Sequence, residues 1–170
     1  DIFKEQKKID YQLDIEAAAA LSQSEIGLIS ASIARNISKI AKSGKITAKR
    51  IKQLEAKSDH DTAALVEALA EKCNKESRPW IHYGLTSNDL VDTSNSMQMR
   101  DAIKIIQPKV SKLSLLLSKN AIKHRSVPAV GRTHGQHASI ISFGLKFANW
   151  AAEMSTHLER LDEIKKRVLI

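Results

Sequence analysis

The sequence of 170 residues contains few of the residues that interrupt or cross-link a chain. It has one cysteine, Cys73, three prolines and six glycines. A single cysteine excludes an internal disulfide framework and a cysteine-based zinc site, and it fits a reducing compartment. We interpret Cys73 as a small, buried apolar residue. The scarcity of proline and glycine leaves room for long helices.

Long apolar runs are also missing. No stretch approaches the roughly 20 uncharged apolar residues that a membrane span needs. The first residues, Asp1 to Lys4, have no signal-peptide pattern. Together with the single cysteine, these features predict a soluble, cytoplasmic protein.

Aromatic residues make up only 4% of the chain, whereas 27 Lys and Arg against 19 Asp and Glu give a net charge of +8. Such a charge suits nucleic acid, a membrane surface or anionic small molecules. The lysines are scattered at spacings typical of solvated helix faces, and no arginine cluster alternates with aromatics. We therefore expect neither a nucleic-acid partner nor a membrane partner.

Apolar residues recur at helical spacing along most of the chain, and we find no convincing strand or internal repeat. Pro108 predicts a kink within one long helix. The pattern predicts helices from Asp10 to about Ser22, from Ser24 to Gly44, from Thr47 to about Lys57, from Ser58 through Leu69, along the stripe Met99 to Ala121, and from Phe143 to Val168 and on to Ile170.

Two long amphipathic helices cannot bury their apolar stripes on each other alone. We therefore expect an all-α chain in which residues 1–87 form an N-terminal helical domain. Residues 88–170 would begin a central long-helix bundle that further helices or oligomeric partners complete. The absence of an initial methionine and a helical pattern that reaches Ile170 favour the same interpretation.

Polar residues of catalytic type gather at three predicted helix boundaries, which hold four of the six histidines. A histidine titrates near neutral pH and can donate a proton to a leaving group. A helix start offers free N–H groups and a positive dipole end to a carboxylate or phosphate. The three motifs are Ser58-Asp59-His60-Asp61, Trp80-Ile81-His82-Tyr83-Gly84-Leu85-Thr86-Ser87-Asn88-Asp89 and Gly131-Arg132-Thr133-His134-Gly135-Gln136-His137-Ala138.

Each motif also has a purely structural interpretation. The first two have the spacing of helix caps, and His134 and His137 could be loop histidines bonded to the main chain. A metal site at these histidines lacks the carboxylates that a closed site needs. A hydrolase pair of Ser87 and His134 lacks the G-x-S-x-G turn that exposes such a serine.

The three motifs resemble the adenylosuccinate lyase family of the fumarase/aspartase superfamily. The resemblance extends from about Ile2 onward and includes Phe143-Gly144-Leu145-Lys146. Argininosuccinate lyases typically carry a Gly-Arg-Ser-Arg-Asn-Asp type of loop, and carboxymuconate cycloisomerases lack the Thr-His-Gly-Gln-His run. Ile140 departs from the family, which often has proline there. The resemblance implies a fumarase/aspartase-type helical bundle.

The resemblance implies β-elimination of fumarate from adenylosuccinate to give AMP, and from the succinyl-carboxamide ribotide (SAICAR) to give AICAR, in purine nucleotide biosynthesis. No metal or organic cofactor is implied. His134 would be the general acid, His82 a supporting histidine, and His60 would lie near the nucleotide and phosphate. The implied catalytic residues are thus His134, His82 and His60, and the implied substrate-binding residues are Asp59, His60, Asp61, Thr86, Ser87 and Thr133.

The family is homotetrameric, and each of its active sites is assembled from three subunits. Its catalytic serine lies in a Ser-Ser-x-Met-Pro-x-Lys-x-Asn-Pro loop, which has no match here, and its early Arg-Tyr pair has none either. We therefore expect an N-terminal portion of a lyase that is inactive in isolation. The alternatives are another lyase or cycloisomerase of the superfamily, and a non-catalytic, basic helical interaction module.

Overall fold

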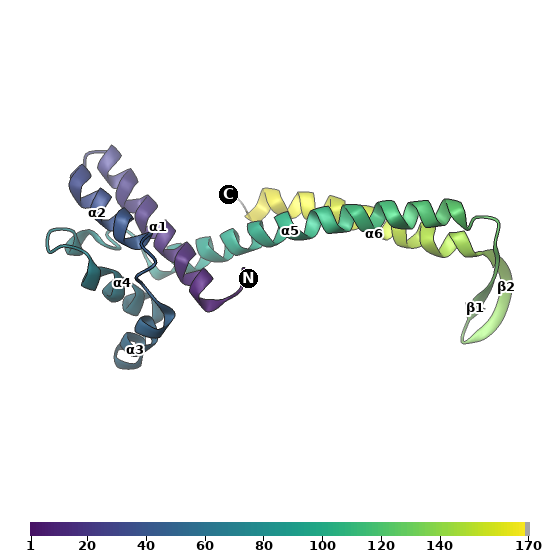
Figure 1. Cartoon of the computed structure of the whole chain (residues 1–170), viewed down its shortest axis with the longest axis horizontal. Coiled ribbons are helices and arrows are strands. Elements are labelled where there is room, and N and C mark those ends of the chain that lie inside the picture. Colours follow the sequence, from purple (N-terminus) through teal and green to yellow (C-terminus); the bar gives the residue numbers. More distant parts are fainter. Residues whose placement is uncertain (169–170) are drawn as a thin grey trace. The chain divides into compact units, whose positions relative to one another are not determined.

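Helices dominate the computed structural model, which describes residues 1–168 (Figure 1). The expected all-α class with long bundle helices is confirmed. No helix in this range combines the length and the apolar character that a membrane span requires. The elements in chain order are α1 (Glu5–Glu25), α2 (Ala31–Ala41), α3 (Ala48–Ser58), α4 (Asp61–Lys72), the 3-10 turn η1 (Arg78–Trp80), α5 (Ser87–Lys123), β1 (Pro128–Thr133), β2 (Gln136–Ser142) and α6 (Phe143–Val168).

The chain divides into two compact units, which we call unit 1 (Asp1–Met99) and unit 2 (Arg100–Ile170). The division falls inside α5. The domain boundary expected between residues 87 and 88 coincides with the beginning of this helix and stays a prediction.

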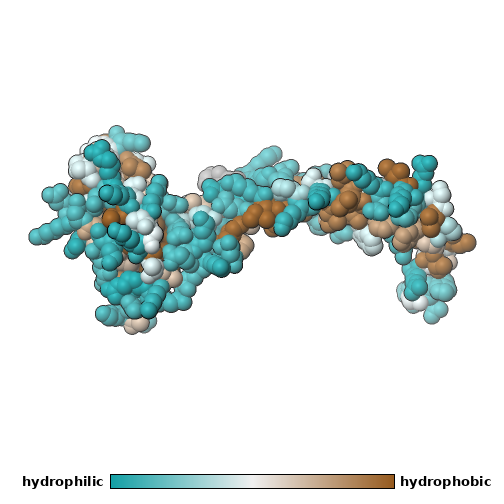
Figure 2. Space-filling view, viewed as in Figure 1, coloured by the Kyte–Doolittle hydropathy of each residue, from teal (hydrophilic) through white to brown (hydrophobic). Residues whose placement is uncertain are grey.

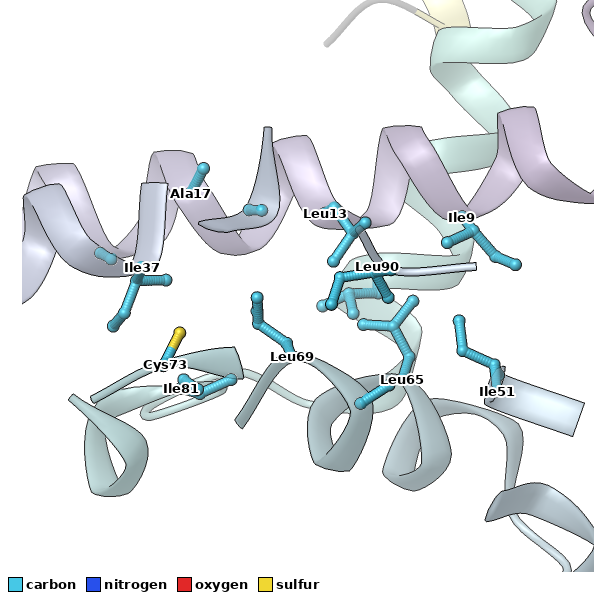
Figure 3. Close-up of a cluster of buried hydrophobic side chains, with 14 of the residues drawn as sticks. Ile9, Leu13, Ala17, Ile37, Ile51, Leu65, Leu69, Cys73, Ile81 and Leu90 are labelled. Carbon is cyan, nitrogen blue, oxygen red and sulfur yellow. The ribbon is translucent and has the colours of Figure 1, made fainter. Parts of the chain in front are cut away.

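Unit 1 is built around a core to which α1, α2, α3, α4 and the start of α5 contribute (Figure 3). Apolar residues at helical spacing give each helix one buried face. Cys73 is 3% exposed in this core, which confirms its interpretation as a buried apolar residue. Burial raises the pKa of its thiol to about 11. The core residues labelled in Figure 3 are Ile9, Leu13, Ala17, Ile37, Ile51, Leu65, Leu69, Cys73, Ile81 and Leu90.

Three predicted helix starts in unit 1 are wrong, and two of them lie within α1. Asp10 lies inside α1, which begins at Glu5, and Ser24 lies near the end of the same helix. The helix ends only after Glu25, where Gly27 adopts a positive φ of 76°. There the Gly27 N–H donates to the Ser24 carbonyl (3.1 Å) and the Leu28 N–H donates to the Gln23 carbonyl (2.9 Å). A serine or aspartate caps a helix only where the chain leaves helical geometry.

The actual cap of α2 is Ser30, whose Oγ accepts from the Ile33 N–H at 3.4 Å. The predicted start of α3 is confirmed, since Thr47 Oγ1 accepts from the Arg50 N–H at 3.3 Å. Ser58 does not cap α4 as predicted. It is the last residue of α3, and His60 takes the capping position.

Within unit 2, α6 runs antiparallel to α5 (Figure 1). Gln107 donates to Asp162 at 2.8 Å, and the Gly144 N–H donates to the His124 carbonyl at 3.0 Å. The helix α5 runs through Pro108, and the expected kink there stays a prediction. Continuation of α6 to Ile170 lies outside the described residues.

The expectation of no strands is wrong for the segment between the long helices. Here β1 and β2 form an antiparallel hairpin in which Thr133 pairs with Gln136. The two turn residues between them, His134 (φ 51°) and Gly135 (φ 75°), both have positive φ, as a type I′ turn requires. Glycine favours this turn, but the short strands lack the regular alternation of a half-buried strand, so the sequence pattern does not reveal them.

Candidate active site

A cavity of about 370 Å³ opens in unit 1 where α4 and α5 begin. It brings together His60, His82 and Ser87, which come from two of the three sequence motifs. The remaining wall comes from the first two turns of α4. Its lining residues are His60, Thr62, Ala63, Val66, Glu67, His82 and Ser87.

His82 lies in the turn after η1 with a φ of 62°, in the left-handed region that a non-glycine residue rarely adopts. Glu16 of α1 fixes it there. Glu16 Oε2 accepts from the His82 main-chain N–H at 2.9 Å, and Glu16 Oε1 lies 2.6 Å from His82 Nδ1. Glu16 is 2% exposed, so the histidine of the cavity is supported by a buried carboxylate.

Glu16 is not among the site residues predicted from the sequence. The residue lies in the apolar stretch Ile15–Ala20, away from the three motifs. The signal was its position: it falls on the helix face that also carries Leu13, Ala17 and Ala20, all of which are buried. A charged residue on a buried face needs a partner, because an unpaired buried charge is costly.

His60 holds the start of α4 through its side chain, since its Nδ1 accepts from the Ala63 N–H at 3.3 Å. Its neighbours diverge. Asp59 is exposed and ends α3 with a φ of 53°. Asp61 Oδ1 accepts from the Thr62 N–H at 2.6 Å, and Asp61 lines a second cavity, of about 200 Å³, together with Lys8. Only His60 of this motif lines the larger cavity, and the predicted roles of Asp59 and Asp61 stay predictions.

The start of α5 combines a cap with the cavity wall. The Thr86 N–H donates to Asp89 Oδ2 at 2.7 Å, which is one half of a capping box, so the capping interpretation holds for this pair. Ser87 lines the cavity as the first residue of a 37-residue helix. The N–H groups and dipole of a helix start stabilise an anion, and they stand here at the cavity.

The third motif belongs to unit 2. His134 is exposed in the turn of the hairpin, and Thr133 is the exposed last residue of β1. His137 lies on β2, also exposed. Within residues 1–168 no group of three or more His, Cys, Asp or Glu side chains is arranged to hold a metal ion. The predicted roles of Thr133 and His134 stay predictions.

Residues 1–170 match the protein family described as Lyase. Because this match extends over the whole sequence, the chain belongs to that lyase family, and the resemblance to the fumarase/aspartase superfamily is confirmed.

The chain is 43% identical over 169 residues to an adenylosuccinate lyase of Methanocaldococcus jannaschii, covering 99% of this chain and 37% of that enzyme. It is 38% identical over 167 residues to an N-acetyl-S-(2-succino)cysteine lyase of Enterococcus italicus, covering 98% of this chain and 36% of that enzyme. A 3-carboxy-cis,cis-muconate lactonizing enzyme from Pseudomonas putida has a similar structure, with a TM-score of 0.93, 32% identity, and coverage of 99% of this chain and 39% of that one. The chain thus spans less than two fifths of each of these relatives.

Proposed function

We propose that this chain is part of an adenylosuccinate lyase, which eliminates fumarate from adenylosuccinate to give AMP, and from SAICAR to give AICAR, in purine nucleotide biosynthesis. The observation that carries the proposal is the cavity in which His60, His82 and Ser87 meet, because all three belong to the motifs that resemble that family. The identity of 43% to an adenylosuccinate lyase supports the same substrate.

In the proposed reaction, a base removes a proton from the carbon next to a substrate carboxylate, and an acid protonates the leaving nitrogen. Negative charge grows on the carboxylate, and N–H groups fixed in advance stabilise such charge. The start of α5, with Thr86 and Ser87, is suited to this task. We assign the acid to His134, with Thr133 contacting the substrate, and His60, Asp59 and Asp61 to the substrate pocket.

The resemblance places the base on a serine loop that has no match in these 170 residues. We therefore expect the isolated chain to be inactive and the complete protein to supply the base. The resemblance also implies a homotetramer, and the sequence features described above predict a cytoplasmic protein. We include both in the proposal.

Exposed apolar side chains of unit 2 support an oligomer (Figure 2). Leu113, Leu116 and Trp150 are each more than two fifths exposed, on two helices that bury few of their apolar side chains in this chain. Exposed apolar surface of this extent is typical of an interaction site.

The test is to incubate the complete protein with adenylosuccinate and to quantify fumarate and AMP by liquid chromatography and mass spectrometry. We expect product from the complete protein and none from the 170-residue chain. His134→Ala should lower kcat by about 100-fold or more, the effect of removing a general acid. His157→Ala, a change on α6 outside all three motifs, serves as the matched control. Near-normal turnover by the His134 variant would refute the assigned acid.

A thioether substrate is the second candidate, favoured by the 38% identity to the N-acetyl-S-(2-succino)cysteine lyase. The same assay, run with N-acetyl-S-(2-succino)cysteine, separates the two. A higher kcat/KM for that compound than for adenylosuccinate would replace the proposed substrate while leaving the lyase chemistry in place.

A further inference from the structure

The buried carboxylate of Glu16 contacts His82 through both of its oxygens, and through two different atoms of that residue. Oε2 accepts from the main-chain N–H at 2.9 Å, and Oε1 lies 2.6 Å from Nδ1. His82 lines the cavity, whereas Glu16 lies behind it at 2% exposure. The pair therefore presents to the cavity an imidazole whose Nδ1 is already engaged.

The two contacts define what the pair does. A main-chain nitrogen can only donate, so Oε2 is an acceptor, and an ionised carboxylate accepts at both oxygens. We propose that Glu16 is ionised, holds the proton of neutral His82 on Nδ1, and thereby makes Nε2 a hydrogen-bond acceptor for the cavity. Glu16 is then a positioning residue, and a protonated Glu16 that donates to Nδ1 would be the opposite arrangement.

His60 provides the contrasting case in the same cavity. Its Nδ1 accepts from the Ala63 N–H at 3.3 Å, so the proton of its neutral ring lies on Nε2. One imidazole thus offers a donor and the other an acceptor, each fixed by a different partner. The tautomers follow from these hydrogen bonds, and only the identity of the ligand rests on the proposed function. An acceptor on His82 suits a hydroxyl or amino group, and a ribonucleotide carries several of these.

The backbone contact has a second consequence. His82 holds a φ of 62°, which costs free energy for a residue with a side chain. The hydrogen bond from its N–H to Glu16 stabilises this conformation at the same time as the contact to Nδ1 orients the ring. A single carboxylate therefore fixes both the position and the tautomer of His82.

The tautomer is read directly from ¹⁵N resonances of the histidine rings in the ¹⁵N-labelled 170-residue chain, at a pH where the rings are neutral. The variants His82→Gln and His60→Gln assign the signals. We expect His82 to show a protonated Nδ1 and an unprotonated Nε2, and His60 to show the reverse. A wild-type His82 with its proton on Nε2 would overturn the proposal without any variant of Glu16.

Glu16→Gln sharpens this test. The carboxamide oxygen can still accept from the His82 main-chain N–H, but its NH₂ group then donates to Nδ1 and moves the ring proton to Nε2. We expect the tautomer of His82 to reverse and that of His60 to stay unchanged. An unchanged His82 pattern in a folded variant would contradict the role of Glu16.

Kinetics of the complete protein test the positioning role. A carboxylate that orients a histidine typically contributes about 10- to 100-fold, so we expect Glu16→Gln to lower kcat/KM by that factor. In a His82→Ala background the same change should have little further effect, because the two residues act as one unit. An equal loss in both backgrounds would show that Glu16 acts only on the fold.

Gln98→Ala is the matched control. Gln98 is a buried polar residue of unit 1 that donates to the Ile2 carbonyl at 2.9 Å and does not line the cavity. We expect it to lower stability but to retain kcat/KM. Absence of turnover in the wild-type complete protein would contradict the proposed function instead, and the ¹⁵N result on Glu16 and His82 would stand independently.

Discussion

The two units of this chain place their apolar side chains very differently. In unit 1, Ile37, Leu65 and Leu69 are each at most 1% exposed. Among the described residues of unit 2, Ile103 is the one large apolar side chain that is buried, at 6% exposure, whereas Ile122 and Ile140 are 67% and 80% exposed. Unit 1 therefore buries its own core, whereas unit 2 offers apolar faces for other surfaces to cover.

The candidate site residues divide between the units in the same way. The residues supported by a packed core, His60, His82 and Ser87, line a cavity within unit 1. Thr133 and His134 lie on an exposed hairpin of unit 2. We propose a homotetramer in which several subunits complete each active site. In such a site the cavity residues of unit 1 would form a fixed wall, and Thr133 and His134 of unit 2 would be added by assembly.

The largest effect expected is at the core of unit 1. Leu69→Ala should lower the free energy of unfolding by about 2–5 kcal/mol, because it leaves a cavity among fully buried side chains. Leu116→Ala, on the exposed face of α5, should change it by about 0.5 kcal/mol or less. Unit 1 contains Trp80 and unit 2 contains Trp150. In the Trp150→Phe chain, tryptophan fluorescence during urea unfolding therefore reports on unit 1, and in the Trp80→Phe chain it reports on unit 2.

Similar losses for the two leucine variants in a monomeric sample would show that unit 2 buries this face within its own chain, as unit 1 does. If Leu116→Ala lowers the free energy of unfolding more at higher protein concentration, a second copy of the chain covers this face of α5.

Gly144 tests a close backbone approach within unit 2. A Cβ added here would lie 2.9 Å from the Cα of Arg125, in the turn after α5, and closer still to the carbonyl oxygen of Ala121 in the last turn of α5. Gly144→Ala should therefore destabilise unit 2 by about 1–3 kcal/mol, despite the higher helix propensity of alanine. The measurement is Trp150 fluorescence, with exposed Lys146→Ala as control. A stabilised Gly144→Ala variant would show that the two helices are not closely packed there.

His60 is both a helix cap and a cavity residue of unit 1. His60→Ala should cost about 0.5–2 kcal/mol through loss of the N-cap, and His60→Asn should restore most of it, since asparagine is a favoured cap. Both variants remove the imidazole. We expect thermal unfolding to separate them and the lyase activity of the complete protein to fall in both. Recovery of activity in His60→Asn would mean that His60 acts only as a cap.

The sequence predicted the helices better than their ends. Apolar spacing is repeated over many residues, so the buried faces of α2 and α4 and the apolar stripe of α6 could be recognised from it. A cap is a single residue, and Asp10, Ser24 and Ser58 all have suitable side chains in places where the chain stays helical. The helix α1 continues past Asp10 and Ser24 to Glu25, and Gly27 then ends it.

The candidate site shows the same limit. The motifs place His60, His82 and Ser87 among the candidate site residues, and the structure shows that the three line one cavity. Their roles stay predictions. Glu16 was not predicted because it lies 66 positions from its partner His82 in the sequence. Their contact depends on how α1 packs against the turn after η1, which the sequence pattern does not show. The hairpin escaped because its short strands lie largely exposed.

Cys73 gives the core of unit 1 a stability that depends on pH. Burial raises the pKa of its thiol from 9.0 to about 11, although the charge of Arg78 opposes the shift. The folded state therefore holds this proton more tightly than the unfolded state does. The resulting stabilisation is fully present below pH 9 and is lost as the pH rises towards 11, at about 1 kcal/mol between pH 9 and 10.

Trp80 fluorescence should show this loss in urea unfolding of the Trp150→Phe chain, and Cys73→Ala should remove the part of the pH slope that the thiol causes. Trp150 in the Trp80→Phe chain should show no difference between the cysteine and alanine forms if unit 2 unfolds independently. If Cys73 changes the pH dependence of unfolding at both Trp80 and Trp150, the two units unfold as one. The difference between the buried core of unit 1 and the exposed helix pair of unit 2 would then be a difference in packing but not in cooperativity.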